Sequence, residues 1–223
     1  VHFEIRHNNE TIGYAVVNDQ NQLLQLFIEE DWQQLAGNAF EELIKEQQIS
    51  EALVGTNNPV FHNILQLAQK ATAVHTLLFT DVAVVATQSI TTPIRLAWQE
   101  DLATLVDFYH ESTGAPSEWL THYLSDLISK GELFFLADVT GIMGACEVRM
   151  SDTNPKVADI GMVVGNSHRK KGLGTYLLGK AKEFTYDLDR VPICSCEVGN
   201  EGSQKAILKN GFKSFHQMLK VAF

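Results

Sequence analysis

The amino-acid sequence predicts an α/β (α+β) fold, with a mixed central sheet flanked by helices, built as a tandem of two related units. Three observations support this prediction. Apolar residues at helical spacing alternate along the chain with short strand-like runs. Turn residues join neighbouring strands into hairpins. The order of elements in the first half also resembles the order that follows residue 133. The 223 residues suffice for two small domains.

The second half contains the clearer pattern. Leu102, Leu105, Val106 and Tyr109 are spaced for one helix face, and Gly211 follows a short helix as a typical C-terminal cap. Helices are expected at 101–111, 117–129, 172–187 and 203–210. Strands are expected at 94–98, 133–138, 141–150, 156–165 and 193–198, and 212–223 is expected to form one long strand or a strand pair.

The first half shows a weaker version of the same order. Strands are expected at 1–8, 11–18, 22–29, 51–55 and 72–80, and helices at 31–47 and 59–70. At an offset of 143 residues, three residues coincide between the halves, namely Asn57 with Asn200, Ile64 with Ile207 and Leu65 with Leu208. We interpret this pattern as an internal duplication. A stretch at 82–93 has no helical period and is interpreted as a strand and a connector, so the predicted domains are 1–91 and 92–223.

The charge distribution argues against a nucleic-acid-binding protein. The net charge is −10, and residues 1–92 contribute −8 of it, whereas a nucleic-acid binder presents a basic surface. An acidic body favours a cationic small substrate or a basic peptide.

Other bulk features indicate a cytoplasmic protein. No apolar run approaches the ~18 residues of a membrane span, and the N-terminus lacks the pattern of a signal peptide. The three cysteines, Cys146, Cys194 and Cys196, are too few for a disulfide framework and favour a reducing compartment. No metal site is expected, because no second Cys/His pair stands at ligand spacing.

The most informative segment joins an expected strand to a helix through the basic loop Arg169-Lys170-Lys171-Gly172-Leu173-Gly174. The first turn of a helix has N–H groups without partners and a partial positive charge, so it suits an anion. Gly172 and Gly174 remove side chains where a phosphate would approach the backbone. Three cations at a helix N-terminus oppose the helix dipole, and a bound polyanion resolves that conflict. The structural alternative is a solvated basic turn whose glycines only shape the entry into the helix.

This segment matches an Arg/Gln-x-x-Gly-x-Gly/Ala motif, and residues 92–223 resemble the GNAT superfamily of N-acetyltransferases. Asn200 stands eleven residues before Gly211 and Phe212, which resembles the second motif of that family. The resemblance implies a GNAT-like fold with acetyl-CoA as cosubstrate. It also implies that an amine of a small molecule or peptide attacks the thioester directly in a ternary complex.

The resemblance places the cofactor contacts at specific positions. In the family, loop amides hold the pyrophosphate of CoA, and the preceding strand splays from its neighbour and pairs with the pantetheine arm. Asn200 and Ser203 correspond to residues that contact the CoA arm, and Asn200 also suits a helix cap. The implied cofactor-binding residues are Met162, Val163, Val164, Arg169, Lys170, Lys171, Gly172, Leu173, Gly174, Thr175, Asn200 and Ser203.

Asp159 is the expected general base, because members of the family often carry an acidic residue about ten positions before the loop. The structural alternative for Asp159 is a strand-end charge that faces solvent. Glu147 on the preceding strand and Glu197 on the next are rivals for the same role.

The general acid departs from the family pattern. Ile207 occupies the position of the usual Tyr, and isoleucine cannot donate a proton to a leaving thiolate. Ser203, Cys196 and Tyr186 are the possible substitutes.

The first half resembles a decayed copy of the same fold. Its helix opens with Glu29, Glu30 and Asp31, which suit a helix N-terminus but repel a pyrophosphate. We therefore expect 1–91 to bind no CoA. Ile207 and this decayed half leave open the hypothesis of a non-catalytic acyl-CoA-binding regulatory protein. A third hypothesis is a scaffold in which both halves serve protein contacts and the basic loop is incidental.

Overall fold

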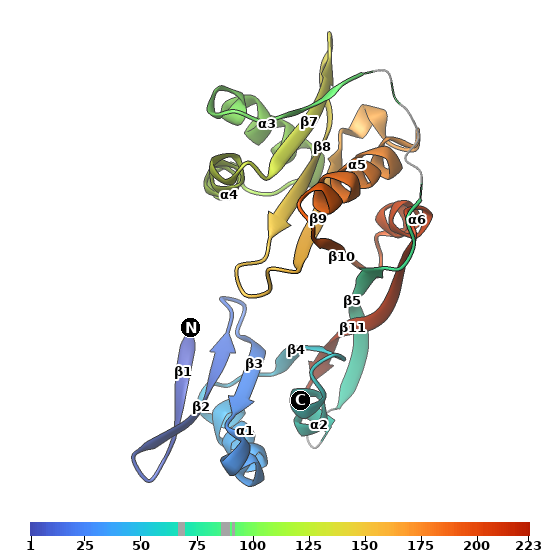
Figure 1. Ribbon diagram of the computed structural model, residues 1–223. Coiled ribbons are helices and arrows are strands. Elements are labelled where there is room, and N and C mark those ends of the chain that lie inside the picture. The colour runs from blue at the N-terminus through green and yellow to red at the C-terminus, as the bar shows by residue number, and fades with distance from the viewer. Residues whose placement is uncertain (67–69, 86–89, 91) are drawn as a thin grey trace. The chain divides into compact units, whose positions relative to one another are not determined.

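The computed structural model describes residues 1–66, 70–85, 90 and 92–223. It contains two compact units, drawn in Figure 1. Unit 1 comprises Val1–Leu78 together with His216–Phe223, and unit 2 comprises Phe79–Phe215. Both units mix helices with a central sheet, which confirms the predicted fold class. No helix in the described ranges has both the length and the apolar character to cross a membrane.

Unit 2 has a mixed sheet with helices on both faces. Its elements are β6 (Ile94–Leu96), η2 (Gln99–Asp101), α3 (Leu102–Thr113), α4 (Ser117–Lys130), β7 (Leu133–Asp138), β8 (Gly141–Met150), β9 (Val157–Val164), η3 (Asn166–His168), α5 (Leu173–Asp187), β10 (Val191–Glu197) and α6 (Glu201–Lys209). Strands β6 to β9 pair antiparallel in sequence order, and β10 pairs parallel with β9 after the crossover helix α5. Figure 1 shows α3 and α4 on one face of this sheet and α5 on the other.

Apolar side chains of α3 and α4 attach these helices to the sheet. Leu105, Val106 and Tyr109 are buried, as their spacing predicts, and pack with Leu120 and Leu124 of α4. Both helices end where a glycine adopts the left-handed conformation, at Gly114 and Gly131, as C-terminal caps commonly do.

Unit 1 has the same kind of sheet but fewer helices. Its elements are β1 (His2–His7), β2 (Glu10–Val17), β3 (Gln22–Ile28), η1 (Glu30–Leu35), α1 (Ala36–Glu46), β4 (Glu51–Gly55), α2 (Pro59–Gln66) and the first part of β5 (Ala71–Asp81). Strands β1, β2 and β3 pair antiparallel, and β3 pairs parallel with β4. Phe40 of α1 and Phe61 of α2 are fully buried against the sheet.

The two halves of the chain repeat one order of elements. The series β1, β2, β3, α1, β4, α2 and β5 matches the series β7, β8, β9, α5, β10, α6 and β11 (Phe212–Ala222), with the same pairings among the first four strands. This order confirms the predicted tandem of related units. The last strand is exchanged, because Met218–Ala222 of β11 pair antiparallel with β4 in unit 1.

Several expected bounds differ in the structure. The helix expected at 31–47 begins as the 3-10 helix η1 and becomes α-helical only at Ala36. The strand expected after 82 is absent from 82–85, because β5 already ends at Asp81, and 86–89 and 91 lie outside the described residues. The helix expected at 59–70 is described as far as Gln66, and 67–69 lie outside the described residues. Of the two forms considered for 212–223, the structure shows one long strand.

Candidate functional site

Strands β9 and β10 pair at one end and then separate. Their register extends from Val157 opposite Val191 to Asp159 opposite Ile193. Beyond that point β9 continues to Val164 and β10 to Glu197. Both strands are fully described, and no further residue of one pairs with the other. Asp159 therefore stands where the two strands begin to diverge.

The separation leaves backbone groups of β9 without a strand partner. Residues of a strand alternate in the side to which their N–H and C=O groups point. The Lys156 C=O accepts from Val191 on the β10 side, whereas the Gly165 N–H donates to Met143 on the β8 side. The backbone N–H and C=O groups of even-numbered residues of β9 thus point toward β10. Those of Met162 and Val164 lie beyond the paired segment and therefore point into the gap. The backbone of Val163 points to β8 instead.

The loop after β9 leads into a helix whose first amides are free. In α5 the first backbone hydrogen bond runs from the Tyr176 N–H to the Gly172 C=O, at 3.1 Å. No hydrogen bond within the described ranges uses the N–H groups of Leu173, Gly174 or Thr175. These amides, with the positive end of the helix dipole, form a site suited to an anion.

The structure favours glycine at the two loop positions, 172 and 174, for different reasons. Gly172 has φ +85° and an open space where a Cβ would lie, so it provides the left-handed turn that starts α5. A Cβ on Gly174 would lie 3.3 Å from Met162 Sδ and 3.5 Å from Val164 Cγ2. Gly174 therefore lets α5 approach β9 closely, whereas the sequence suggested that it makes room for a phosphate.

Two cationic side chains of the loop hold the loop itself. Arg169 donates from Nε to the Val164 C=O at 3.2 Å and from Nη2 to the Ser112 C=O at 2.6 Å, which ties the loop to β9 and α3. Lys171 donates to the Ser167 C=O at 2.9 Å. The guanidinium of Arg169 is therefore a brace as well as a positive charge.

A cavity of about 1010 Å³ lies between the loop, β9 and α6. Of the twelve cofactor residues expected from the sequence, all except Lys171 and Leu173 line it. Leu173 turns its side chain into the core, where it is buried. Asn200 caps α6 by accepting from the Ser203 N–H at 3.0 Å, as its capping role predicts.

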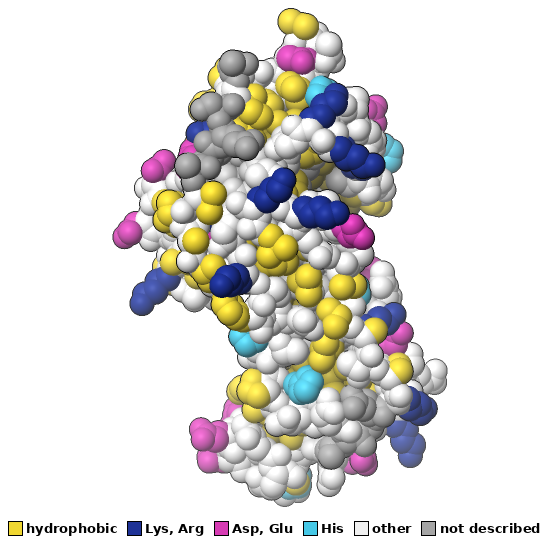
Figure 2. Space-filling view, turned by 90° about the vertical axis from the view of Figure 1, so that its right-hand side faces the viewer, with side chains coloured by type: hydrophobic (Ala, Val, Ile, Leu, Met, Phe, Trp, Pro, Cys, Tyr) yellow, Lys and Arg dark blue, Asp and Glu magenta, His cyan; other side chains and the backbone are white. Residues whose placement is uncertain are grey.

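The cavity also has a basic lining that sequence reasoning only partly found. Arg169 and Lys170 of the loop are joined by Lys205 and Lys209 of α6, while Glu201 is its one acidic lining residue among the described residues. Lys205 and Lys209 are four residues apart on a helix and thus share a face, a spacing that could have revealed them. Figure 2 shows Lys and Arg side chains gathered on the upper half of the face that it presents.

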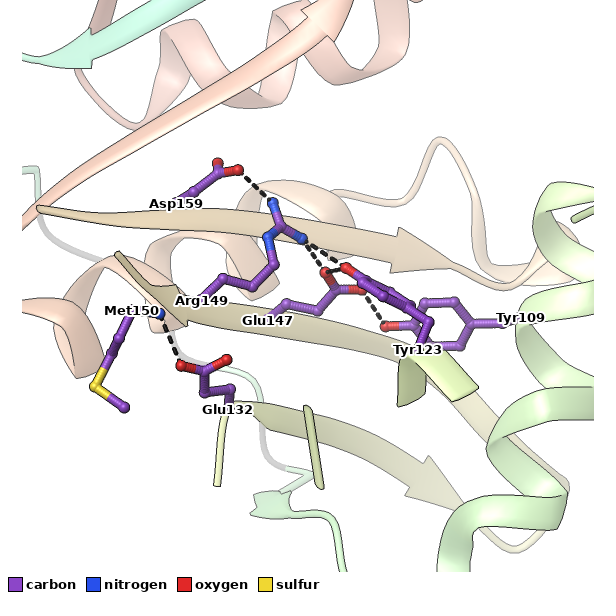
Figure 3. A network of polar contacts seen from close by, with 7 residues as sticks. All are labelled: Tyr109, Tyr123, Glu132, Glu147, Arg149, Met150 and Asp159. Atoms are coloured by element: carbon purple, nitrogen blue, oxygen red, sulfur yellow. Dashed lines mark hydrogen bonds and ion pairs between the residues drawn. The ribbon is translucent and has the colours of Figure 1, made fainter. Parts of the chain in front are cut away.

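The expected general base lies on the face of β9 that α3 and α4 cover. Asp159 accepts from Arg149 Nη2 at 2.8 Å, and its side chain is 44% exposed. Figure 3 shows Arg149 extending between Asp159 and Glu147, which is buried. Neither of these carboxylates, nor the rival Glu197, lines the large cavity.

Glu147 is the centre of a hydrogen-bond network. It accepts from the hydroxyls of Tyr109 at 2.9 Å and Tyr123 at 2.6 Å, and it forms an ion pair with Arg149. Burial, reinforced by the Glu147 charge, raises the pKa of both tyrosines, so they act as neutral donors. These three groups already occupy the carboxylate oxygens of Glu147. Glu147 is therefore a less accessible proton acceptor than Asp159. Trp119 stacks on Tyr123 with ring centroids 4.8 Å apart, and Trp119 is 55% exposed.

The possible general acids differ in position. Ile207 stands at the position of the family's Tyr. Its side chain is buried in the core at 3% exposure, so an apolar group packs at that position. The Tyr186 hydroxyl donates to Asp81, and neither Tyr186 nor Cys196 lines the cavity. Burial raises the pKa of the Cys196 thiol. Ser203 alone of the three substitutes lines the cavity.

The corresponding place in unit 1 is built differently. β3 and β4 also pair only at their start, at Gln22–Leu23 opposite Glu51–Ala52. The chain then enters η1 without a glycine loop, and the Ala36 N–H at the helix start donates to the Gln33 C=O. The acidic residues Glu30 and Asp31 lie in the first turn of η1. The described residues contain no group of His, Cys, Asp or Glu arranged to hold a metal ion.

Comparison with known protein families identifies both halves. Residues 1–82 and 87–213 each match a family described as an acetyltransferase (GNAT) domain. No curated protein sequence matches the chain at a significant level.

Solved structures of GNAT proteins share this fold. An acetyltransferase of the GNAT family from Colwellia psychrerythraea has 27% sequence identity and a TM-score of 0.93, over all of this chain and 85% of its own. A GCN5-related N-acetyltransferase from Sphaerobacter thermophilus has 12% identity and a TM-score of 0.70, over 96% of this chain and 77% of its own. A tandem GNAT protein from the clavulanic acid biosynthesis pathway shares the fold, with 16% identity and a TM-score of 0.65, over 99% of this chain and 81% of its own. With GNAT domains matched across both halves, the chain belongs to the GNAT acetyltransferase family.

Proposed function

We propose that unit 2 is an acetyl-CoA-dependent N-acetyltransferase that acts on a primary amine of a small molecule or peptide, by direct attack in a ternary complex. One combination of features carries this proposal. Strand β9, where it diverges from β10, and the start of α5, with its free amides and the basic loop before it, border the same cavity. An amide-rich arm would pair with the open strand, and a diphosphate would lie at the helix start.

The chain's residues fit acetyl-CoA in its chemistry. The free N–H groups of Leu173, Gly174 and Thr175 match the anionic oxygens of a diphosphate. Lys170, Lys205 and the other lining cations offset its charge. Met162 presents its N–H and C=O groups toward the gap, where they would hold amides of the arm, and the Val164 N–H points the same way, while its C=O accepts from Arg169.

The bound cosubstrate would supply an activated acyl group as a thioester. The remaining requirements fall on this chain: holding the amine, polarising a carbonyl through a backbone N–H, and removing a proton. The Met162 N–H is suited to polarisation because it faces the gap just beyond the paired segment. Asp159, at the point of divergence and partly exposed, is suited to accept the proton directly or through water.

We also propose that unit 1 binds no CoA. The start of η1 carries the carboxylates of Glu30 and Asp31, which oppose a bound anion, and at the start of α1 the Ala36 N–H is already bonded to the Gln33 C=O. Acidic side chains at that place would repel a diphosphate.

Calorimetry with acetyl-CoA and thiol release with a panel of amines test the proposal. We expect one acetyl-CoA per chain and thiol release with at least one class of primary amine. Absence of binding would show that the cavity is misassigned, and two equivalents per chain would contradict the proposal for unit 1. Tight binding without turnover on a broad panel would favour an acyl-CoA-binding regulator, the alternative that the buried Ile207 supports.

A further inference from the structure

We propose that Arg149 is a positioning residue for the transfer reaction: anchored by Glu147 and Tyr123, it holds the Asp159 carboxylate where β9 and β10 diverge. This inference rests on the proposed role of Asp159 as proton acceptor.

The contacts of Arg149 run from the interior to the surface. Arg149 on β8 stands directly opposite Asp159 on β9 in the antiparallel register. Its Nη1 contacts Glu147 and lies 3.0 Å from the Tyr123 hydroxyl, while its Nη2 lies 2.8 Å from Asp159 Oδ2. The three side chains are increasingly exposed, from Glu147 at 6% through Arg149 at 31% to Asp159 at 44%. Figure 3 shows this chain of contacts.

The anchoring gives the outer ion pair a fixed direction. An exposed arginine–aspartate pair is normally a weak and mobile contact. Here the guanidinium is planar and one of its edges is already held by a buried carboxylate and a hydroxyl, so the direction in which its other edge donates is set. Asp159 thus receives a hydrogen bond of defined orientation, and its second oxygen stays available.

The charges around Asp159 suit this role. Glu147 offsets the positive charge of Arg149, so the guanidinium does not act on Asp159 as an unopposed cation. Other titratable groups that interact with this set, among the described residues, are neutral donors or thiols, such as Tyr109 on α3, Tyr123 on α4, Cys146 on β8 and Cys194 on β10. The pKa of each is raised chiefly by burial. Glu147, Arg149 and Asp159 together carry one net negative charge, which favours an approaching ammonium group.

Three variants separate geometry from charge. Arg149→Lys keeps the charge but lacks the planar guanidinium that fixes the direction of donation to Asp159, so we expect kcat to fall at least about 10-fold, with an unchanged KM for acetyl-CoA and an unchanged acidic limb of the pH–rate profile. Arg149→Met also removes the charge, so the acidic limb is expected to move to higher pH. Glu147→Gln leaves the guanidinium charge unopposed, so the limb is expected to move to lower pH.

Arg95→Lys is the matched control. Arg95 also binds a carboxylate through two nitrogens, with Asp101 Oδ1 and Oδ2 at 2.6 and 2.8 Å, but it lies on β6 and outside the site. We expect its kcat and pH profile to match those of the parent.

Two results would overturn the inference. One is an Arg149→Lys variant with the kcat of the parent, or with a loss no larger than that of Arg95→Lys. The other is a crystal structure of Arg149→Lys in which the Asp159 carboxylate keeps the parent orientation, a readout that does not depend on activity. A parent protein without transfer on any amine would instead refute the proposed function, and the crystal structure would still decide the positioning role.

Discussion

Replacing Gly172 by glutamate tests the assignment of the anion site most directly. Gly172 precedes α5 with φ +85°, borders the cavity, and has no atom within 4 Å of the place that a Cβ would occupy. A new side chain there meets no steric obstacle, so the fold is expected to survive. Its carboxylate would extend beside the free amides of Leu173, Gly174 and Thr175, which we expect to bind the diphosphate.

The expected magnitudes differ for stability and for binding. A residue with a Cβ in the left-handed region costs roughly 1–2 kcal/mol, and each kcal/mol lowers the Tm of a chain of this size by ~2–4 °C. A carboxylate about 5 Å from one diphosphate charge, at an effective dielectric constant of about 20, is repelled by ~3 kcal/mol. That repulsion weakens the Kd for acetyl-CoA by about 100-fold.

Gly172→Ala provides the control, because it introduces the same backbone strain without the charge. Thermal unfolding is expected to show a similar loss of a few degrees for both variants. Calorimetry with acetyl-CoA is expected to show near-parent affinity for Gly172→Ala and a Kd about 100-fold weaker for Gly172→Glu. Should Gly172→Glu bind acetyl-CoA within a few-fold of the parent, the diphosphate does not lie at this helix start.

Three further predictions concern single residues. For Asp159→Asn we expect kcat to fall by ~100-fold or more with an unchanged Kd for acetyl-CoA, since Asp159 does not line the cavity; a parent-like rate across the pH range would remove it as the base. For Ile207→Tyr we expect a loss of ~1–3 kcal/mol in unfolding free energy from overpacking and no gain in kcat, because the position is buried; a faster enzyme would contradict this. For Lys182→Met we expect a loss of ~3–5 kcal/mol in denaturant unfolding, because Lys182 Nζ lies 2.6 Å from the buried Asp81 carboxylate; a variant as stable as a Lys180→Met control would refute the importance of this pair.

Local patterns in the sequence predicted most elements and much of the cavity. The helix that starts after Gly172 and the cap at Asn200 depend on residues that are near neighbours in the chain. The elements whose order repeats in the two halves are likewise each local to a short stretch of the chain. Hydrogen bonds and apolar periods within an element are short-range, so the sequence displays them directly. The loop at 169–174, which we propose binds the diphosphate, belongs to this group, because its glycines, its cations and its free amides all lie within a few residues of one another.

Only the tertiary structure decided which distant residues meet. The pairing of β11 with β4 brings the C-terminal strand into unit 1, although it belongs to the second repeat. The contact of Arg149 with Tyr123 joins β8 to α4, and Lys205 and Lys209 complete the basic cavity from a separate helix. These contacts depend on how strands pair and helices pack across long sequence separations. The sequence alone therefore determined a GNAT-like unit with its basic glycine loop, while the folded chain determined the surroundings of Asp159 and the place of β11 beside β4.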